Sequence, residues 1–282
     1  MISARDRWQA QVVLLPNGMP IEIDPRDLIG REILQSGHWE PETVSFLHSW
    51  LRDEMTVIDA GAHVGYHALM ASARVGPRGM VHAFEPNPVV YDALRRNIER
   101  AGGSNLVALP HALGRRSETR DLYLHAVTNR GATSFRPHDP ATERAVPVDV
   151  IALDEYLAAR RIARVDVLKI DVEGAEREVL AGAAGTLAAC PDIVLIVEFL
   201  RENTDRFGYT VEDLESDLRS HGFRLLTLEP GGLAPYLPVG ERAVNVVAVR
   251  DVARLLQRLG EPLASRLMRQ LYLARTPRHD RE

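Results

Sequence analysis

Cysteine is almost absent from this chain, since Cys190 is the only one among 282 residues. A single cysteine excludes an intrachain disulfide framework and a multi-cysteine metal site, and it is typical of proteins in a reducing compartment. Long hydrophobic runs are absent too. The strongest run, residues 193–197, is far shorter than a membrane span, and the early run at 12–15 is too short for the apolar core of a signal peptide. We therefore expect a cytoplasmic protein that makes no membrane contact.

Positive charge is not in excess. The 34 Lys and Arg residues against 39 Asp and Glu residues give a formal net charge of −5, so no global field attracts nucleic acid or an anionic membrane. A nucleic-acid partner is therefore disfavoured. Hydrophobic residues make up 45% of the chain, which is enough to build the core of a globular enzyme of this length.

Short apolar runs alternate with amphipathic stretches through the middle of the chain. The runs include MTVIDAG, MVHAFEP, NLVALPHALG, VDVLKIDVEG and DIVLIVEFL, with helices expected from about residues 65, 88 and 174. This alternation is typical of βαβ units and a parallel sheet. LYLHAV and AVPVDVIAL add strands around a loop at 128–141, and FRLLTLEP and VNVVAVR suggest an antiparallel hairpin. We expect an α/β fold with a mostly parallel seven-stranded sheet and an antiparallel edge hairpin.

The chain divides into three expected parts: an N-terminal extension at 1–50, a catalytic domain at 51–250 and a helical extension at 251–282. The first part contains a β-hairpin at 11–24 around Pro16-Asn17-Gly18 and a helix at 41–51. The last part has leucines at helical spacing, broken by Gly260 and Pro262, which predicts two helices. Its arginines suggest a solvated helix face or the contact of a homodimer more than a phosphate or membrane site.

The first strand of the catalytic domain ends in a glycine-containing turn. Gly61 and Gly65 follow Asp59, and a helix is expected directly afterwards. Such a turn lets the backbone approach a ligand, and the helix start offers unpaired N–H groups. Glu85 ends the next strand twenty residues after Gly65, where an acidic group can accept hydrogen bonds from ribose hydroxyls. Each signal is weak alone, but their spacing indicates a cofactor that contains a nucleoside.

Asp59 bears on which nucleoside cofactor is bound. Dinucleotide sites favour G-x-G-x-x-G, whereas this turn reads D-x-G-x-x-x-G. A carboxylate facing a pyrophosphate would repel it. Asp59 suits instead a cofactor that carries an ammonium and a sulfonium, so S-adenosylmethionine is favoured over NAD.

Charged residues follow one apolar strand where the sheet should end. Lys169, Asp171 and Glu173 alternate, so they would share one side if the strand continued, and Glu198 ends the next strand. Ligands bind beyond the carboxyl ends of strands in such sheets. Asp171, Glu173 and Glu198 are therefore the first candidates for a catalytic base, ahead of His63 and His138. The alternatives are a helix cap for Glu173, an ion pair for Lys169, and an oxygen-ligand Mg²⁺ site, although no sharper metal spacing occurs.

Several motifs together resemble the FkbM family of methyltransferases. They are VIDAGAHVGYHAL, HAFEPNP, HALG and VDVLKIDVEGAEREVL, with PNG and GHWE upstream, and the resemblance covers roughly residues 12–230. It implies a Rossmann-like class I methyltransferase fold and S-adenosylmethionine as the cofactor. It also implies O-methylation, commonly of sugars, polyketides or other secondary metabolites.

The resemblance implies roles for individual residues. Asp59, Gly61 and Gly65 would line the methionine side of the cofactor, Glu85 the ribose and His111 to Leu113 the adenine, while Glu40 would help to close the site. The full expected cofactor-binding set is Glu40, Asp59, Gly61, His63, Gly65, Glu85, Pro86, His111, Ala112, Leu113 and Asp171. The expected catalytic set is Asp171, Glu173 and Glu198, with no committed metal ligand.

The expected partner is a small-molecule acceptor. Two interpretations of the loop from Thr128 to Phe135 stay open: a lid over the acceptor, with Arg130 or Ser134 in contact, and an ordinary surface hairpin. Three other functions stay open at this point. They are N-methylation of a small molecule or peptide, a catalytically silent binding protein with the cofactor fold, and nicotinamide-dependent oxidoreduction.

Overall fold

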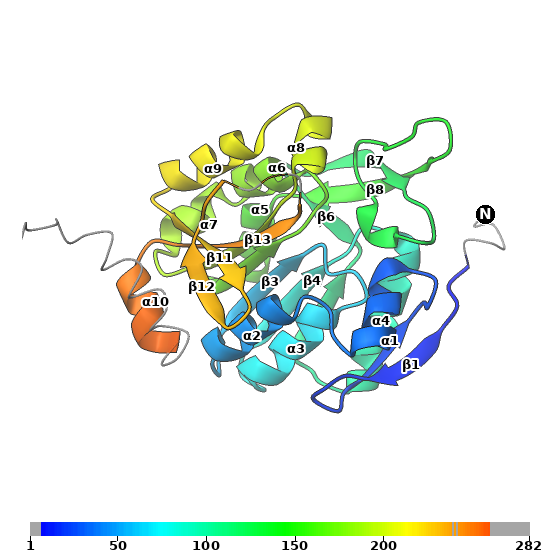
Figure 1. Cartoon of the computed structure of the whole chain (residues 1–282), viewed down its shortest axis with the longest axis horizontal. Helices are drawn as coiled ribbons and strands as arrows, with labels where there is room; N and C mark the ends of the chain where they lie inside the picture. The colour runs from blue at the N-terminus through cyan, green and yellow to red at the C-terminus, as the bar shows by residue number, and fades with distance from the viewer. Residues whose placement is uncertain (1–6, 239, 241, 260–282) are drawn as a thin grey trace, which may run out of the picture.

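A central eight-stranded sheet organises the computed structural model, which describes residues 7–238, 240 and 242–259. The strand order is β12-β11-β13-β10-β9-β3-β4-β5 (Figure 1). The five strands from β10 to β5 are parallel, and β13 and β11 continue the sheet through antiparallel pairs. The bounds are β3 (Thr56–Ala60), β4 (Met80–Phe84), β5 (Leu106–Leu109), β9 (Val167–Ile170), β10 (Val194–Phe199), β11 (Arg224–Glu229), β12 (Gly232–Pro235) and β13 (Val244–Val249).

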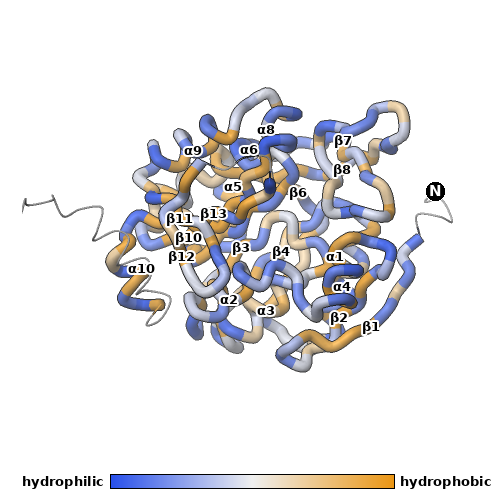
Figure 2. The backbone as a smooth tube through the Cα atoms, in the orientation of Figure 1, coloured by the Kyte–Doolittle hydropathy of each residue, from blue (hydrophilic) through white to orange (hydrophobic). Residues whose placement is uncertain are grey.

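Helices cover both faces of this sheet, which confirms the predicted α/β architecture (Figure 1). They are α1 (Leu28–Ser36), α2 (Pro41–Trp50), α3 (Tyr66–Val75), α4 (Pro88–Ala101), α5 (Leu153–Arg160), α6 (Glu176–Gly182), α7 (Ala184–Ala189), α8 (Arg201–Phe207), α9 (Val211–Ser220) and α10 (Val252–Leu259). Neighbouring residues of one strand face opposite sides of the sheet. Val57 belongs to the core cluster that includes residues of α2, α3 and α4, and Ile58 to the cluster that includes residues of α5, α6 and α9. Figure 2 shows the hydrophobic segments running through the centre of the molecule.

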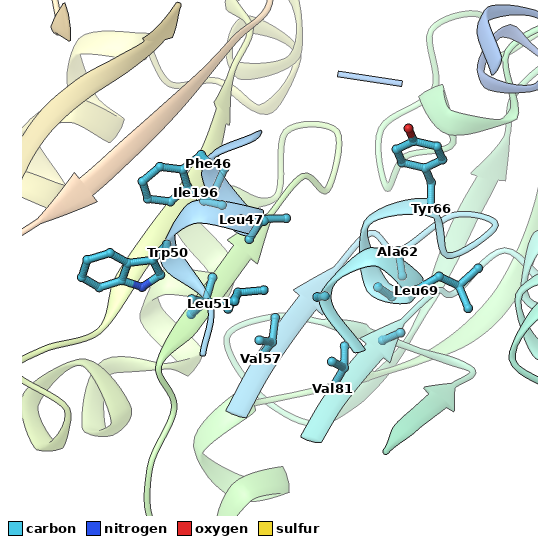
Figure 3. Packing of buried hydrophobic residues seen from close by; sticks show 14 of the residues in the cluster. Phe46, Leu47, Trp50, Leu51, Val57, Ala62, Tyr66, Leu69, Val81 and Ile196 are labelled. Carbon is cyan, nitrogen blue, oxygen red and sulfur yellow. The ribbon is translucent and has the colours of Figure 1, made fainter. Parts of the chain in front are cut away.

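The N-terminal segment packs on the same core. The predicted hairpin is confirmed as β1 (Gln11–Leu14) and β2 (Pro20–Ile23), an antiparallel pair. Glu22 of β2 is buried, and its carboxylate pairs with Arg96 of α4 at 2.7 Å while Asn97 bonds its backbone. Figure 3 shows Phe46 and Trp50 of α2 packed beside the strands. The predicted helix at 41–51 is therefore confirmed, whereas α1 is an addition that the sequence did not predict.

A second, three-stranded sheet corrects the sequence prediction for the middle of the chain. It contains β6 (His111–Leu113), β8 (Arg144–Ile151) and β7 (Glu118–Leu124), in that order. The run NLVALPHALG is therefore not one strand, because Pro110 separates β5 of the main sheet from β6 of the small one. The loop between β7 and β8 contains one short 3₁₀ helix, η1 (Arg130–Ala132).

The predicted edge hairpin is present, but the sheet has one strand more than the seven expected. The turn at Gly231 and Gly232, both with positive φ, folds residues 232–235 back onto β11 as β12. At the C-terminus, α10 confirms the first predicted helix, and the second lies outside the described residues. Within the part of the chain that the structure describes, no helix is long and apolar enough to cross a membrane.

Candidate active site

A cavity of about 530 Å³ opens beyond the carboxyl ends of β3, β4, β9 and β10, in the size range of cofactor sites. Ten of the thirteen residues expected from the sequence line its wall. They are Glu40, Gly61, His63, Glu85, Pro86, Ala112, Leu113, Asp171, Glu173 and Glu198. Asp59 and Gly65 lie behind the wall, at the strand end and the helix start, and His111 lies on β6 outside it.

Gly61 is required by the approach of two backbone segments. A Cβ atom at this position would lie 1.8 Å from the Asp171 carbonyl oxygen, and φ is +83°. Gly65, with φ of +89°, would place a Cβ atom 2.6 Å from Leu94 Cδ1. The sequence argument attributed both glycines to a ligand, whereas their nearest neighbours belong to the protein. Only Gly61 also faces the cavity.

Glu85 is held at the end of β4 by two backbone N–H groups. His63 N donates to Glu85 Oε2 at 2.9 Å, and Asn87 N donates to Oε1 at 2.8 Å. Burial nevertheless raises the pKa of Glu85 to about 7. The carboxylate is thus oriented by its own turn and retains acceptor capacity on the side of the cavity.

Asp59 and Lys169 stand opposite each other on the paired strands β3 and β9. Burial raises the pKa of Asp59 to about 6, although the Lys169 charge opposes this shift. Lys169 Nζ donates to Asp171 Oδ2 at 2.7 Å. Burial alone would lower the pKa of Lys169, but the nearby carboxylates outweigh it and raise that pKa. The ion pair considered from the sequence as the alternative for Lys169 is confirmed.

Asp171, Glu173 and Glu198 form a group of three carboxylates in which one oxygen from each lies within 4.8 Å of the others. Strand β9 ends at Ile170, and Glu173 has φ of +57°, so the strand does not continue and the alternation considered for Lys169, Asp171 and Glu173 does not hold. Glu173 does not cap the next helix either. Glu176 accepts from Gly174 N at 3.0 Å, and Glu173 accepts from Asn203 Nδ2 at 2.8 Å.

Burial shifts the acidity of this carboxylate group. It raises the pKa of Glu173 to about 8, with the Asp171 charge adding to the effect. The pKa of Glu198 also rises well above its usual value, through burial first and then the neighbouring carboxylates. Glu198 Oε2 is buried and makes no hydrogen bond within the described residues. A buried carboxylate with a raised pKa can accept a proton near neutral pH.

Several residues in or next to the cavity wall have buried polar atoms without hydrogen-bond partners. Among the described residues they include Glu40 Oε2, both carboxylate oxygens of Asp59 and both ring nitrogens of His63. Glu40, His63 and Glu173 are also three of the five non-glycine residues with positive φ in that part of the chain. Unpaired buried polar groups and strained backbone are costly and typically mark ligand sites. These atoms fit a polar, charged cofactor.

The loop after β7 covers one side of the cavity, as the lid interpretation expected. Residues 129–135 line the wall, and Ser134 Oγ donates to the Glu173 carbonyl at 2.7 Å. Arg130 N donates to Asp27 Oδ1 at 2.7 Å, which joins the loop to the N-terminal segment. The sequence argument did not name Trp39 and Asn203, which line the cavity, or Asp27, which anchors the loop. Trp39 lies in the quoted GHWE motif, whereas no local motif marks Asp27 or Asn203.

A family comparison agrees with this geometry. The model of the methyltransferase FkbM domain matches residues 59–225, which is more than half of the chain and includes the ends of β3, β4, β9 and β10. The chain belongs to the FkbM family of methyltransferases. It therefore contains an S-adenosylmethionine-dependent methyltransferase domain, and the alternative of NAD chemistry is set aside.

Curated relatives of this FkbM-family chain include two with informative names. The 31-O-demethyl-FK506 methyltransferase FkbM of Streptomyces tacrolimicus is 32% identical over 202 residues, 62% of this chain and 75% of the relative. A hexuronic acid methyltransferase of Haloferax volcanii is 28% identical over 164 residues. That match covers 55% of this chain and only 61% of the relative's length.

Among solved structures, an S-adenosylmethionine-dependent methyltransferase from Aquifex aeolicus has a similar fold. The match covers 78% of this chain and 94% of the Aquifex aeolicus chain. The sequence identity is 16% and the TM-score is 0.45.

Proposed function

We propose that this FkbM-family methyltransferase transfers the methyl group to a hydroxyl oxygen of a small molecule, of the sugar or polyketide class. The observation that carries the proposal is the half-buried carboxylate group of Asp171, Glu173 and Glu198 beside the cofactor turn of β3. An alcohol must lose a proton as it is methylated, and a buried carboxylate is suited to receive it. The names of the two relatives, which specify a hexuronic acid and 31-O-demethyl-FK506 as acceptors, support this class of acceptor.

The cofactor would occupy the side of the cavity between Gly61 and Glu85. When bound, S-adenosylmethionine supplies an electrophilic methyl group on a sulfonium. In this proposal Glu85 accepts hydrogen bonds from the ribose, while Ala112 and Leu113 border the adenine. Asp59 and Glu40 supply negative charge that favours the ammonium and sulfonium of the ligand.

Among the carboxylates, Glu198 is the best candidate for the base. Asp171 is already paired with Lys169, and Glu173 accepts a hydrogen bond from Asn203. Glu198 Oε2 has no such partner among the described residues, so its lone pairs are available to an acceptor hydroxyl. Methyl transfer is an in-line displacement, so the remaining contribution of the protein is to position the two reactants.

The proposal is tested by acceptor screening with S-adenosylmethionine that carries a deuterated methyl group. Hexuronic acids, simple glycosides and hydroxylated macrolides form the acceptor panel, with amino sugars as matched nitrogen acceptors. Product mass shows transfer, and fragmentation locates the label on oxygen or nitrogen. The proposal is supported if the label is found on oxygen and the rate of its transfer falls by about 10²–10⁴-fold in Glu198→Gln. Label on the amine of an amino sugar, with its hydroxyls untouched, overturns it.

A further inference from the structure

Two histidines and a glutamate meet at the base of the loop that covers the cavity. The β7–β8 ladder ends with the pair Leu124 and Arg144. His125 and Glu143 are the next residues on each strand, so they face each other across the open end of the ladder. His138 returns from the loop to join them, and its ring lies 4.6 Å from that of His125. The cluster thus holds both ends of residues 125–143.

The two imidazoles converge on one carboxylate oxygen. His125 Nδ1 is hydrogen-bonded to Glu143 Oε1, and His138 Nδ1 lies 3.4 Å from the same oxygen. His138 Nδ1 is buried and makes no hydrogen bond within the described residues, although its own backbone N donates to Glu143 Oε2 at 2.9 Å. One ligand atom from each residue lies within 4.8 Å of the other two. The side chain of Glu143 is 6% exposed.

This arrangement matches the preferences of a transition-metal ion such as Zn²⁺. Two imidazole nitrogens and one carboxylate oxygen form a common ligand set, with bonds of about 2.0–2.2 Å. In a tetrahedron of that size neighbouring ligand atoms lie roughly 3.4 Å apart, which is the separation of His138 Nδ1 and Glu143 Oε1. A direct hydrogen bond would be shorter.

We propose that His125, His138 and Glu143 bind a divalent ion of the Zn²⁺ type. Both imidazoles bind through Nδ1, and the ion replaces the hydrogen bond between His125 and Glu143. His125 and His138 line the cavity and Glu143 does not, so the fourth position of the ion faces the cavity and takes a water molecule. The ion clamps the two ends of the loop that carries Asn129 and Ser134. This site is separate from Asp171, Glu173 and Glu198, and it does not depend on the proposed acceptor.

Metal titration of the full chain tests the site. After treatment with EDTA, the protein is titrated with Zn²⁺ in competition with a chromogenic chelator, and with Co²⁺ as a visible-absorption probe. We expect one ion per chain, d–d bands typical of tetrahedral Co²⁺, and a Zn²⁺-dependent rise in melting temperature. His138→Ala and His125→Ala should each weaken Zn²⁺ binding by at least about 100-fold and abolish the d–d bands.

Two control variants locate the ion. His48→Ala removes an exposed histidine of α2 and should bind Zn²⁺ like the wild type. Glu198→Gln changes the separate carboxylate group of Asp171, Glu173 and Glu198 and should also leave Zn²⁺ binding unchanged. Thermal melting in EDTA shows whether each variant is folded. The melting temperatures of His125→Ala and His138→Ala should differ from that of the wild type only when Zn²⁺ is present. Zn²⁺ binding that persists in both ligand variants, or that disappears in Glu198→Gln alone, overturns the proposal.

Discussion

Gly61 and Asp171 come into direct backbone contact where β3 and β9 end, and no side chain fits between them. A Cβ atom at Gly61 would lie 1.8 Å from the carbonyl oxygen of Asp171 and 2.9 Å from its carbonyl carbon. Gly61 N also donates to the Phe84 carbonyl at 3.0 Å. The contact therefore fixes the position of the turn after β3 relative to Asp171. Gly61 in this way helps to position both the cofactor turn and the carboxylate group of Asp171, Glu173 and Glu198.

Gly61→Ala should destabilise the fold and disturb the site together. The new methyl group collides with backbone, which cannot rotate away, and φ of +83° is unfavourable for alanine. The left-handed conformation costs about 1–2 kcal/mol and the overpacking about 1–3 kcal/mol, so we expect a loss of about 2–5 kcal/mol in the free energy of unfolding. Denaturant unfolding measures it. Gly208→Ala is the matched control, since Gly208 has φ of +79° but nothing within 4 Å of its Cβ position. Equal losses in both variants would contradict the proposed contact.

Lys169→Met should destabilise the protein more at pH 8 than at pH 5. Removal of the buried ammonium leaves Asp59 and Asp171 without their cation, which costs about 3–5 kcal/mol where both are charged. The pKa of Asp59, which burial already raises to about 6 against the Lys169 charge, then rises further above that of the unfolded chain. Such a group favours the folded state at low pH and loses that contribution as pH rises through the folded pKa.

The free energy of unfolding at the two pH values provides the comparison. Arg95→Met, which removes an exposed ion pair with Glu99, should change stability by less than about 1 kcal/mol at both. A Lys169→Met loss that is the same at pH 5 and pH 8 would show that its ammonium does not hold the two carboxylates in their charged form.

The rate of methyl transfer should rise with pH through the neutral range. Burial raises the pKa of Glu173 to about 8 and also raises that of Glu198, and the base must be unprotonated to act. The ascending limb of kcat/KM belongs to these interacting groups as a set and not to one residue. Measurement between about pH 5.5 and 9.5 should show it, and Glu198→Gln should lower kcat/KM throughout. Glu202→Gln, at an exposed residue of the same cavity, should preserve the profile. A flat profile in the wild type would exclude a carboxylate base.

The fold and much of the site could be predicted from the sequence because their signals are local. Strand-length apolar runs gave the parallel sheet, and Asp59, Gly61 and Glu85 were found from their positions at strand ends. The structure confirmed that Gly61 and Glu85 line the cavity. Asp59 and Gly65 are not part of the cavity wall, and a Cβ atom at Gly65 would meet Leu94, so their assignment to the cofactor stays a prediction.

Other features arise only from tertiary contacts. Asp27 reaches Arg130 across more than a hundred residues of sequence, and no spacing rule relates them. Helix α1 begins after Asp27, a residue type that favours helix starts, but the Asp27 carboxylate accepts a hydrogen bond from Arg130 N and does not cap the helix. His125 and Glu143 are brought together by the register of β7 and β8, which depends on how the loop folds.

The cofactor site between Gly61 and Glu85 is tested most directly by calorimetric titration with S-adenosylhomocysteine. The wild type should bind with a Kd of the order of micromolar, and NADH should give no binding heat. Glu85→Gln should weaken binding by about 10–100-fold, because hydrogen bonds to a charged acceptor contribute about 1.5–3 kcal/mol. Asp59→Ala should weaken it as well, and Glu99→Gln, at an exposed residue of α4, should not. Unchanged affinity in both Glu85→Gln and Asp59→Ala, with both variants folded, would contradict this placement of the cofactor.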